Sequence, residues 1–336
     1  MLSVVCPIYN EEKYIAQCIE SILRQDYPKE DLEILFVDGM STDHTREIID
    51  GYIAKYPFIR LLDNPRSVVP CAMNIGIKAA QGSIIMRLDG HCDFPSNYFS
   101  RLTFELGRLS ADNVGGVCET LPCDDSAMAI GIAKALSCSF GMGNSQFRIG
   151  CDKIKEVDTV PFGCFHKELF DRIGLYDEEL VRNQDDELNA RIIQNGGKIY
   201  IIPDVVIKYY ARDRLKKVWN MFYQYGLYKP LVNKKLKEPA TMRQFFPLLF
   251  VLGLAIGWLG VFINPYLIIP YLAVICLYIV IGMAIGAKVG KQKNRMSLIL
   301  LQPVIFCAIH IGYGWGYIKG IVKVMTNQSF YVKFNR

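Results

Sequence analysis

Short apolar runs alternate with segments of helical period over residues 1–88. Residues 2–6 form a continuous apolar run, after which Ile15, Cys18, Ile19 and Ile22 recur at helical spacing until Asp26-Tyr27-Pro28. Such a run is typical of a buried strand, and the recurrence after it is typical of a helix. The alternation continues with predicted strands at 34–37, 59–62 and 83–88 and with predicted helices that end near 56 and cover 70–80. This order predicts an α/β fold with a mostly parallel sheet covered on both faces.

Residues suited to ligand binding come directly after all four predicted strands. They are Pro7-Ile8-Tyr9-Asn10-Glu11, Asp38, Asn64-Pro65-Arg66 and Asp89-Gly90-His91-Cys92-Asp93. Any one of these segments alone is more often a turn or a cap than a site. In open α/β sheets, however, ligands bind beyond the carboxyl ends of the strands. Four such segments at one edge therefore predict a binding site there.

The residues at this edge of the sheet indicate that a metal ion, and not a glycine-rich loop, holds the phosphates of the ligand. Neither a Gly-x-Gly-x-x-Gly segment after the first strand nor a Walker motif is present in the sequence. Asp89 and His91, one residue apart on a strand-end turn, can both reach one divalent cation. Carboxylate oxygen suits Mg²⁺ or Mn²⁺, and imidazole favours Mn²⁺ somewhat. The cation would hold a diphosphate, for which Arg66, Arg148 and Arg212 are further candidate ligands.

The C-terminal part of the chain is much more apolar than the rest. Residues 245–287 contain no Asp, Glu, Lys, Arg or His, and Asn264-Pro265 divides them in two. At about 1.5 Å per helical residue, this run is roughly two bilayer crossings long. We expect transmembrane helices at 245–263 and 266–287, with a third apolar segment at 298–318. The chain thus divides into a domain at 1–240 and a membrane domain at 241–336.

Basic residues flank this pair of predicted helices on both sides. Lys234, Lys235, Lys237 and Arg243 precede it, and Lys288, Lys291, Lys293 and Arg295 follow it. The positive-inside rule then places both flanks, and the large domain, in the cytoplasm. Lys319, Lys323, Lys333 and Arg336 beyond the third segment conflict with a full crossing. That segment is therefore left open as re-entrant or interfacial.

Composition narrows the class of protein. With 336 residues, 51% hydrophobic and 21% charged, the chain is neither disordered nor collagen-like. The net charge of +5, from 38 basic and 33 acidic residues, is only mildly basic and predicts no nucleic-acid partner. Eleven cysteines without a Cys-x-x-Cys pair indicate a reducing compartment, in which most of them are small core residues.

Three segments at the predicted sheet edge resemble family 2 glycosyltransferases with a GT-A fold. They are residues 7–11, Val37-Asp38-Gly39-Met40-Ser41-Thr42-Asp43 and Arg87-Leu88-Asp89-Gly90-His91. Three later segments, 140–144, 157–163 and 183–189, resemble the membrane-anchored members of exopolysaccharide biosynthesis, such as succinoglycan glycosyltransferases. The resemblance implies a Rossmann-like nucleotide-diphospho-sugar transferase domain followed by C-terminal transmembrane helices.

The resemblance also implies roles for individual residues. Pro7, Tyr9 and Glu11 would line the base and ribose of the nucleotide-sugar, and Asp38 would contact the base. Asp89 takes the place of the first Asp in the Asp-x-Asp metal motif of the family. His91 stands where the family more commonly has a second Asp, so the resemblance implies an Asp and a His as the metal ligands.

Asp185, Asp186 and Glu187 open a predicted helix that continues to Gly196-Gly197. A helix dipole stabilises acidic residues in the first turn by about 0.3–1 kcal/mol per charge. Three neighbouring carboxylates repel one another, however, which is easier to understand if one of them faces a cation or a hydroxyl. In the family that the chain resembles, the Asp at the place of Asp185 is the general base.

The function expected from the sequence is an inverting, metal-dependent glycosyl transfer in bacterial exopolysaccharide or cell-surface polysaccharide biosynthesis. The donor would be a nucleotide-sugar, with UDP-sugar favoured, and the acceptor a polyprenyl-diphosphate-linked glycan. The enzyme would be a multi-pass protein of the inner membrane with a cytoplasmic catalytic domain. Two alternatives stay open: a polyprenyl-phosphate sugar synthase, and a non-catalytic nucleotide-sugar-binding membrane subunit.

Overall fold

A computed structural model describes residues 1–330 of the chain. The chain forms two compact units, each made of two stretches. Unit 1 comprises residues 1–119 and 150–209, and unit 2 comprises residues 120–149 and those from 210 onward. This division differs from the single boundary expected at 240. The reason is that helices α5 (Ala127–Leu136) and α10 (Leu215–Leu236) pack against the C-terminal helix α13 (Leu298–Met325).

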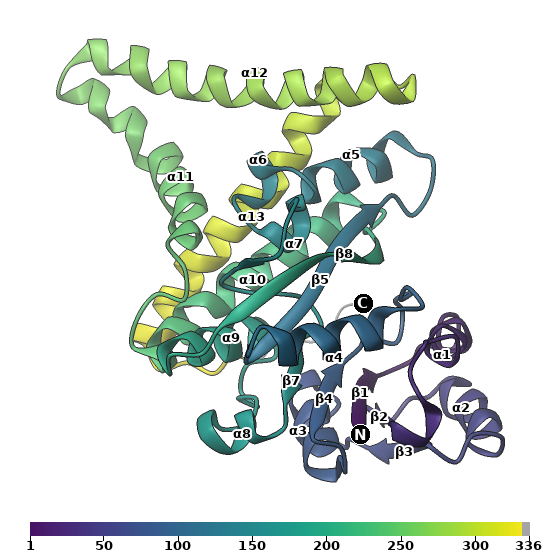
Figure 1. Ribbon diagram of the computed structural model, residues 1–336. Helices are drawn as coiled ribbons and strands as arrows, with labels where there is room; N and C mark the ends of the chain where they lie inside the picture. The colour runs from purple at the N-terminus through teal and green to yellow at the C-terminus, as the bar shows by residue number, and fades with distance from the viewer. Residues whose placement is uncertain (331–336) are drawn as a thin grey trace. The chain divides into compact units, whose positions relative to one another are not determined.

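The described residues contain one sheet with the strand order β3-β2-β1-β4-β7-β5-β8-β6 (Figure 1). Its strands are β1 (Leu2–Ile8), β2 (Leu32–Asp38), β3 (Ile59–Asp63), β4 (Ile84–Arg87), β5 (Asn113–Leu121), β6 (Lys155–Glu156), β7 (Cys164–His166) and β8 (Ile199–Tyr210). The pairs β1/β2, β2/β3 and β1/β4 are parallel, whereas β4/β7, β5/β7 and β6/β8 are antiparallel. The predicted α/β class is confirmed, but only the N-terminal half of the sheet is parallel.

Helices alternate with the parallel strands as the apolar periods predict. Those of unit 1 are α1 (Ile15–Leu23), α2 (Thr45–Ile53), α3 (Val69–Ala79), α4 (Tyr98–Arg108), α8 (Glu168–Ile173) and α9 (Gln184–Gln194). The strand order reverses at β1, which has β2 on one side and β4 on the other. The carboxyl ends of β1, β2 and β4 therefore form the switch point at which open α/β sheets bind ligands.

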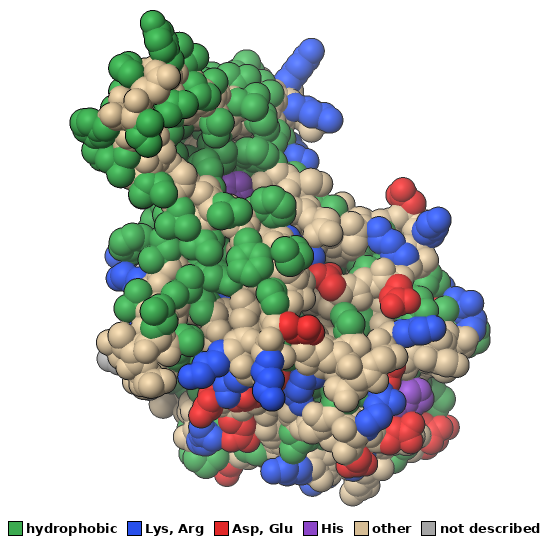
Figure 2. All heavy atoms as spheres, turned by 90° about the vertical axis from the view of Figure 1, so that its left-hand side faces the viewer, with side chains coloured by type: hydrophobic (Ala, Val, Ile, Leu, Met, Phe, Trp, Pro, Cys, Tyr) green, Lys and Arg blue, Asp and Glu red, His purple; other side chains and the backbone are tan. Residues whose placement is uncertain are grey.

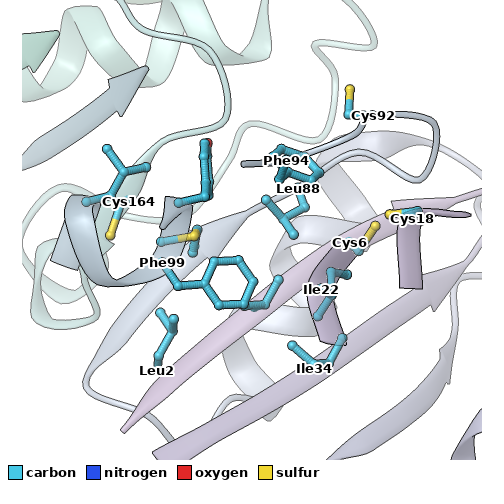
Figure 3. Packing of buried hydrophobic residues seen from close by; sticks show 14 of the residues in the cluster. Leu2, Cys6, Cys18, Ile22, Ile34, Leu88, Cys92, Phe94, Phe99 and Cys164 are labelled. Carbon is cyan, nitrogen blue, oxygen red and sulfur yellow. The ribbon is translucent and has the colours of Figure 1, made fainter. Parts of the chain in front are cut away.

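The buried core of unit 1 lies between the strands and helices α1 and α4 (Figure 3). Cys6 of β1 lies beside Cys18 and Ile22 of α1 there, and Leu2 of β1 and Phe99 of α4 belong to the same cluster. All eleven cysteines are free, and six of them are buried: Cys6, Cys18, Cys71, Cys92, Cys118 and Cys164. Burial raises the pKa of the Cys6 and Cys164 thiols, which keeps them neutral. The expectation that most cysteines are core residues is confirmed.

Unit 2 contains the C-terminal helices α10, α11 (Phe245–Ile256), α12 (Ile268–Lys293) and α13, and the short helices α5, α6 (Ser139–Met142) and α7 (Gln146–Ile149). Three stretches are long and apolar enough to cross a membrane: Met242–Phe262, Pro265–Lys293 and Leu298–Met325. They begin close to the predicted starts at 245, 266 and 298, and the last two extend beyond the predicted ends. Only 6% of the apolar window is buried in each of the first two, against 50% in the third. Hydrophobic side chains accordingly cover the surface of the first two helices (Figure 2).

Candidate active site

The loops after β1 and β2 are tied together by hydrogen bonds at the switch point. The Asn10 amide donates to Ser41 Oγ at 2.8 Å, and the Thr42 amide donates to Asn10 Oδ1 at 2.8 Å. The Glu11 amide donates to Thr45 Oγ1 at 2.7 Å. Asn10 and Met40 adopt φ values of 53° and 65°, a region that few non-glycine residues occupy. The two loops thus form one rigid wall of the predicted site.

Asp38 is the centre of this wall. Its side chain is fully buried, and it accepts hydrogen bonds from the Ser41 amide at 3.0 Å and from the Ser41 hydroxyl. Arg46 Nη1 lies 2.6 Å from Asp38 Oδ2, and Arg46 Nη2 lies 2.8 Å from Asp63 Oδ1. Hydrogen bonds to Asp38 and Asp63 raise the pKa of Arg46. Asp38 therefore organises its own loop, and its direct contact with a base stays a prediction.

Pro7 and Tyr9 lie where the sequence predicts them, at the end of β1. Pro7 is buried and pairs with Val37 of β2. Tyr9 is half-buried and packs against Gly39, where an added Cβ would lie 3.2 Å from Tyr9 Cδ2. A side chain at position 39 would thus displace the Tyr9 ring from its place beside β2.

Glu11 and His91 meet across the site. Glu11 is 4% exposed, and its Oε1 lies 3.2 Å from His91 Nδ1. A histidine that binds a metal commonly donates its second ring N–H to a carboxylate, which orients the ring. The contact of Glu11 with Nδ1 therefore leaves the other ring nitrogen, Nε2, as the atom that could bind a metal. Glu11, expected to line the ribose, is placed to orient His91.

Arg87, the last residue of β4, joins the predicted metal ligand Asp89 to the predicted general base Asp185. Its Nη1 forms an ion pair with Asp185 Oδ1, and its Nη2 lies 3.4 Å from Asp89 Oδ1. The Arg87 side chain is 7% exposed, whereas those of Asp89 and Asp185 are 24% and 39% exposed. Among residues 1–330, the second carboxylate oxygen of Asp89 and that of Asp185 accept no hydrogen bond. In both carboxylates, Arg87 thus holds one oxygen, and the second oxygen is available to a ligand.

Two of the three acidic residues at the start of α9, Asp185 and Glu187, have separate cationic partners. Asp185 pairs with Arg87, and Glu187 Oε1 lies 2.6 Å from Arg191 Nε on the same helix. Burial raises the pKa of Asp185, Arg87 opposes that rise, and Asp89 and Asp186 add to it. Ion pairs with arginines thus offset the repulsion between these carboxylates, and the general-base role of Asp185 stays a prediction.

A strained loop completes the surroundings of Arg87. Phe162 adopts a φ of 45°, and the Arg87 guanidinium lies 6.0 Å from the centroid of its ring. Tyr98 Oη donates to the Phe162 carbonyl at 3.2 Å. Farther along this loop, Asn189 of α9 donates to Thr159 Oγ1 at 2.8 Å. These contacts fix α9, and with it Asp185, against the end of β4.

Arg66 is placed differently from the other predicted site residues. It is exposed, and its Nη1 forms an ion pair with Glu178 Oε2. Glu178 also accepts from Asn74 Nδ2 at 2.9 Å, and that bond lowers the pKa of Glu178 first, with Arg66 a smaller cause. A phosphate role for Arg66 would require exchange of this carboxylate for a ligand, and it stays a prediction.

The residues at the end of β4 fit a divalent cation in their chemistry. Asp89 presents one carboxylate oxygen, and His91 is oriented by Glu11. Among the described residues, no group of three or more His, Cys, Asp or Glu side chains is arranged so that it could hold a metal ion by itself. A cation here would therefore take only part of its ligands from the protein, as Mg²⁺ does when it binds substrate phosphates.

The fold and this site define a glycosyltransferase with a GT-A fold. The chain belongs to glycosyltransferase family 2, because the model of the family described as Glycosyl transferase family 2 matches residues 3–172. It is 30% identical over 98% of its length to a Methanococcus voltae dolichyl N-acetyl-α-D-glucosaminyl phosphate 3-β-D-2,3-diacetamido-2,3-dideoxy-β-D-glucuronosyltransferase, of which it covers 99%. It is 28% identical to the succinoglycan biosynthesis protein ExoA of Rhizobium meliloti, over 94% of this chain and 93% of that protein.

Two solved structures show the same fold. The mannosyltransferase PcManGT of Pyrobaculum calidifontis, in complex with GDP-Man and Mn²⁺, superposes with a TM-score of 0.57 at 20% identity. That match covers 94% of this chain and 87% of the other. TarS 1–349 of S. aureus, in complex with UDP-GlcNAc, gives a TM-score of 0.53 at 17% identity and covers 99% and 93%. The family resemblance and the GT-A fold expected from the sequence are confirmed.

Proposed function

We propose that this protein is an inverting, metal-dependent glycosyltransferase that moves one sugar from a nucleotide-sugar, UDP-sugar being favoured, to a polyprenyl-diphosphate-linked glycan. The observation that carries the proposal is the ion-pair geometry of Arg87, which holds Asp89 and Asp185 on one guanidinium. This arrangement places a carboxylate suited to the donor diphosphate beside a carboxylate suited to the acceptor hydroxyl.

Asp185 is the proposed general base. A sugar hydroxyl is a poor nucleophile, and removal of its proton during attack on C1 lowers the barrier. Asp185 Oδ1 is fixed by Arg87, which leaves Oδ2 to accept that proton. As the new C1–O bond forms on one face of the sugar, the bond to the nucleoside diphosphate breaks on the other. A single displacement of this kind inverts the anomeric centre.

The donor side would use the wall formed by the first two loops. Pro7, Tyr9, Asp38 and Glu11 are proposed to bind the nucleoside, with Arg66 near the diphosphate. Asp89 and His91 would hold Mn²⁺ or Mg²⁺, and Glu11 keeps the His91 ring oriented. When bound, the cation stabilises the negative charge of the departing diphosphate. The complexes of PcManGT with GDP-Man and Mn²⁺ and of TarS with UDP-GlcNAc support a nucleotide-sugar donor and a metal.

The acceptor and the location are proposed from the relatives and the apolar helices. The Methanococcus voltae relative is named for a dolichyl-phosphate-linked sugar, and ExoA for succinoglycan biosynthesis. These names support a lipid-linked glycan acceptor for this chain. Helices α11 and α12 would anchor it as a multi-pass protein in the bacterial inner membrane, with both flanks of the pair and the catalytic domain in the cytoplasm.

The test is nucleotide release by the detergent-purified full chain and its Asp185→Asn variant. UDP-, GDP- and dTDP-sugars are offered with bacterial lipid extract, in the presence of Mn²⁺ or EDTA. We expect metal-dependent release with one donor and a loss of at least about 100-fold in the variant, because general-base help is typically worth 10²–10⁴-fold. Asp186→Asn, one residue along the same helix, is the matched control.

Two other outcomes would replace the proposal. Lipid-dependent release that survives Asp185→Asn would indicate a polyprenyl-phosphate sugar synthase, because a lipid phosphate needs little general-base help. Nucleotide-sugar binding without release under any condition would indicate a non-catalytic subunit. Binding is measured separately by calorimetry, so that an inactive preparation is distinguished from a non-catalytic one.

A further inference from the structure

Helix α13 has two contrasting faces. One face is buried in unit 2 and includes Leu298, Gln302, Ile305, Phe306, Ile309, Gly312, Gly316 and Gly320. The opposite face is covered by α12 at Pro303 and by α11 at Gly314, where Gly282 and Pro247 pack. Between these contacts it carries exposed apolar residues, of which the most exposed are Leu300, Val304, Trp315, Val322 and Met325. These exposed positions recur close to multiples of 3.6 residues, so they form one straight stripe on the helix.

The C-terminal half of α13 lies directly against α10. A Cβ on Gly316 would clash with the Tyr223 carbonyl, and a Cβ on Gly226 of α10 would clash with the Tyr313 carbonyl. Asn233 Nδ2 of α10 donates to Tyr317 Oη at 2.9 Å. The two backbones thus touch, and the contact requires glycine on both helices.

Helix α10 itself does not have the character of a membrane span. It contains Lys216, Lys217, Lys229, Lys234 and Lys235, and it is not among the three stretches apolar enough to cross a bilayer. Residues 211–214 alone connect it to β8. Its start therefore lies on the same side of the membrane as the sheet. Because α10 packs along residues 312–320, that half of α13 lies on this side too.

The N-terminal half of α13 packs against a second segment, residues 120–149, which follows β5 in the chain. Gln302 is fully buried, and its Nε2 donates to the Gly131 carbonyl of α5 at 3.1 Å. Phe306 packs edge-on against Phe140 of α6, with ring centroids 4.8 Å apart. Residues 120–149, which contain both short helices, lie in the chain between two stretches of unit 1. Both halves of α13 therefore pack on segments that are joined directly to unit 1 in the chain: residues 120–149 connect two stretches of unit 1, and α10 follows β8.

The lysines at the C-terminal end of α13 also favour a position on the side of the membrane that carries the sheet. Lys319 and Lys323 lie in the last turns of α13, and Lys319 Nζ is 5.7 Å from the Trp315 ring and 5.8 Å from the Tyr223 ring. Lysines beside exposed aromatic and aliphatic residues are typical of helices that lie against anionic lipid surfaces. The positive-inside rule also favours the cytoplasm for this end of the helix.

We propose that α13 does not cross the membrane and that its exposed apolar stripe contacts the bilayer from the catalytic side. The α11–α12 pair is then the transmembrane anchor, and α13 returns the chain to the helices that follow β5 and β8. The inference deepens the proposed membrane anchoring and rests on it. It also removes the conflict between a third crossing and the basic residues Lys319 and Lys323 at the end of α13.

The test compares the two ends of the full chain. An epitope tag is placed before Met1 or after Arg336, and membranes of a bacterial host are treated with protease as intact spheroplasts and as inverted vesicles. A periplasmic reporter protein controls for protease access. We expect both tags to be cleaved only in inverted vesicles. Cleavage of the C-terminal tag in intact spheroplasts would overturn the inference.

A second variant avoids the tag. Met325→Cys places a thiol at the exposed end of α13, and labelling by a membrane-impermeant maleimide is compared with that of the unmodified chain. Additional label only in inverted vesicles supports the inference, and additional label in spheroplasts contradicts it. Neither experiment reads sugar transfer, so a failed transferase assay leaves this result standing. Loss of the chain from carbonate-washed membranes would refute the anchoring itself and the inference with it.

Discussion

Replacement of Arg87 by Met should change the pH dependence of catalysis as well as stability. The guanidinium is 7% exposed and pairs with Asp89 and Asp185. Met fills a similar volume and removes the charge. An adjacent arginine lowers the pKa of an aspartate, so its loss should raise the pKa of Asp185, although water weakens the effect because this side chain is 39% exposed. That pKa is already above its ordinary value because of burial.

The expected readout is the acidic limb of the kcat/KM profile. The base works only when ionised, so activity falls as the pH drops below the pKa of Asp185. The limb should therefore move to higher pH in Arg87→Met. An acidic limb that coincides with that of the unmodified enzyme would refute the idea that Arg87 controls the base.

Stability should fall in the same variant. Removal of one partner of a buried ion pair costs about 3–5 kcal/mol, and the partial exposure of both aspartates reduces this to roughly 2–3 kcal/mol. For a unit of this size, such a loss lowers Tm by about 4–12 °C. The raised pKa of Asp185 means that the folded state binds more protons than the unfolded state. The loss should therefore be largest above that pKa and shrink as the pH falls through it.

Arg191→Met is the matched control for both measurements. Arg191 pairs with Glu187 on the same helix and also donates to the carbonyls of Ile173 and Leu175. Its loss should lower Tm by several degrees without moving the acidic limb. A shift of the limb in this control as large as that in Arg87→Met would show that the limb reports a general loosening of α9.

Three further predictions concern the donor site and α13. Glu11→Gln should weaken activation by Mn²⁺ about 10–100-fold, read from a metal titration of activity, because the neutral amide orients His91 less well. Equal titrations for variant and parent would remove Glu11 from the metal site. Asp38→Asn should lower the free energy of unfolding by roughly 1–3 kcal/mol and also weaken UDP binding in calorimetry. Unchanged UDP affinity in a destabilised variant would leave Asp38 a purely structural role. Gly316→Leu should lower Tm in detergent by overpacking against α10, at a cost of roughly 1–3 kcal/mol, whereas Gly253→Leu enters open space and should not. Equal Tm values for the two leucine variants would contradict the close α10–α13 contact.

The position of the site could be predicted from the sequence because it depends on local order. Apolar runs define β1, β2 and β4, and the residue after a parallel strand lies at the sheet edge whatever the rest of the chain does. Asp38 and Asp89 could therefore be placed from the pattern alone, and the structure has them at the ends of β2 and β4. The pairing of Asp185 with Arg87 could not be predicted in this way, because it joins residues almost one hundred positions apart.

Arg87 was missed as a site residue for an identifiable reason. It ends a run of apolar strand residues, Ile84-Ile85-Met86, and a single arginine there is usually a strand end that reaches solvent. Its burial follows from β7, which pairs antiparallel with β4, and from the Phe162 loop beside it. The antiparallel half of the sheet likewise rests on long-range pairing, which apolar periodicity does not encode.

Backbone strain around the site supports a pre-formed catalytic arrangement. Asn10, Met40, Ser67, Phe162 and Asn183 all have φ between 45° and 65°, and they lie in the loops that carry the candidate residues. Each such residue costs on the order of 1–3 kcal/mol and persists only when its surroundings hold it. Here the surroundings are the bonds between the first two loops, the Tyr98 contact to Phe162 and the start of α9. The folded protein thus holds Asp89 and Asp185 in place before any substrate binds. Stabilisation of a transition state by fixed charges requires groups that are oriented in advance in this way.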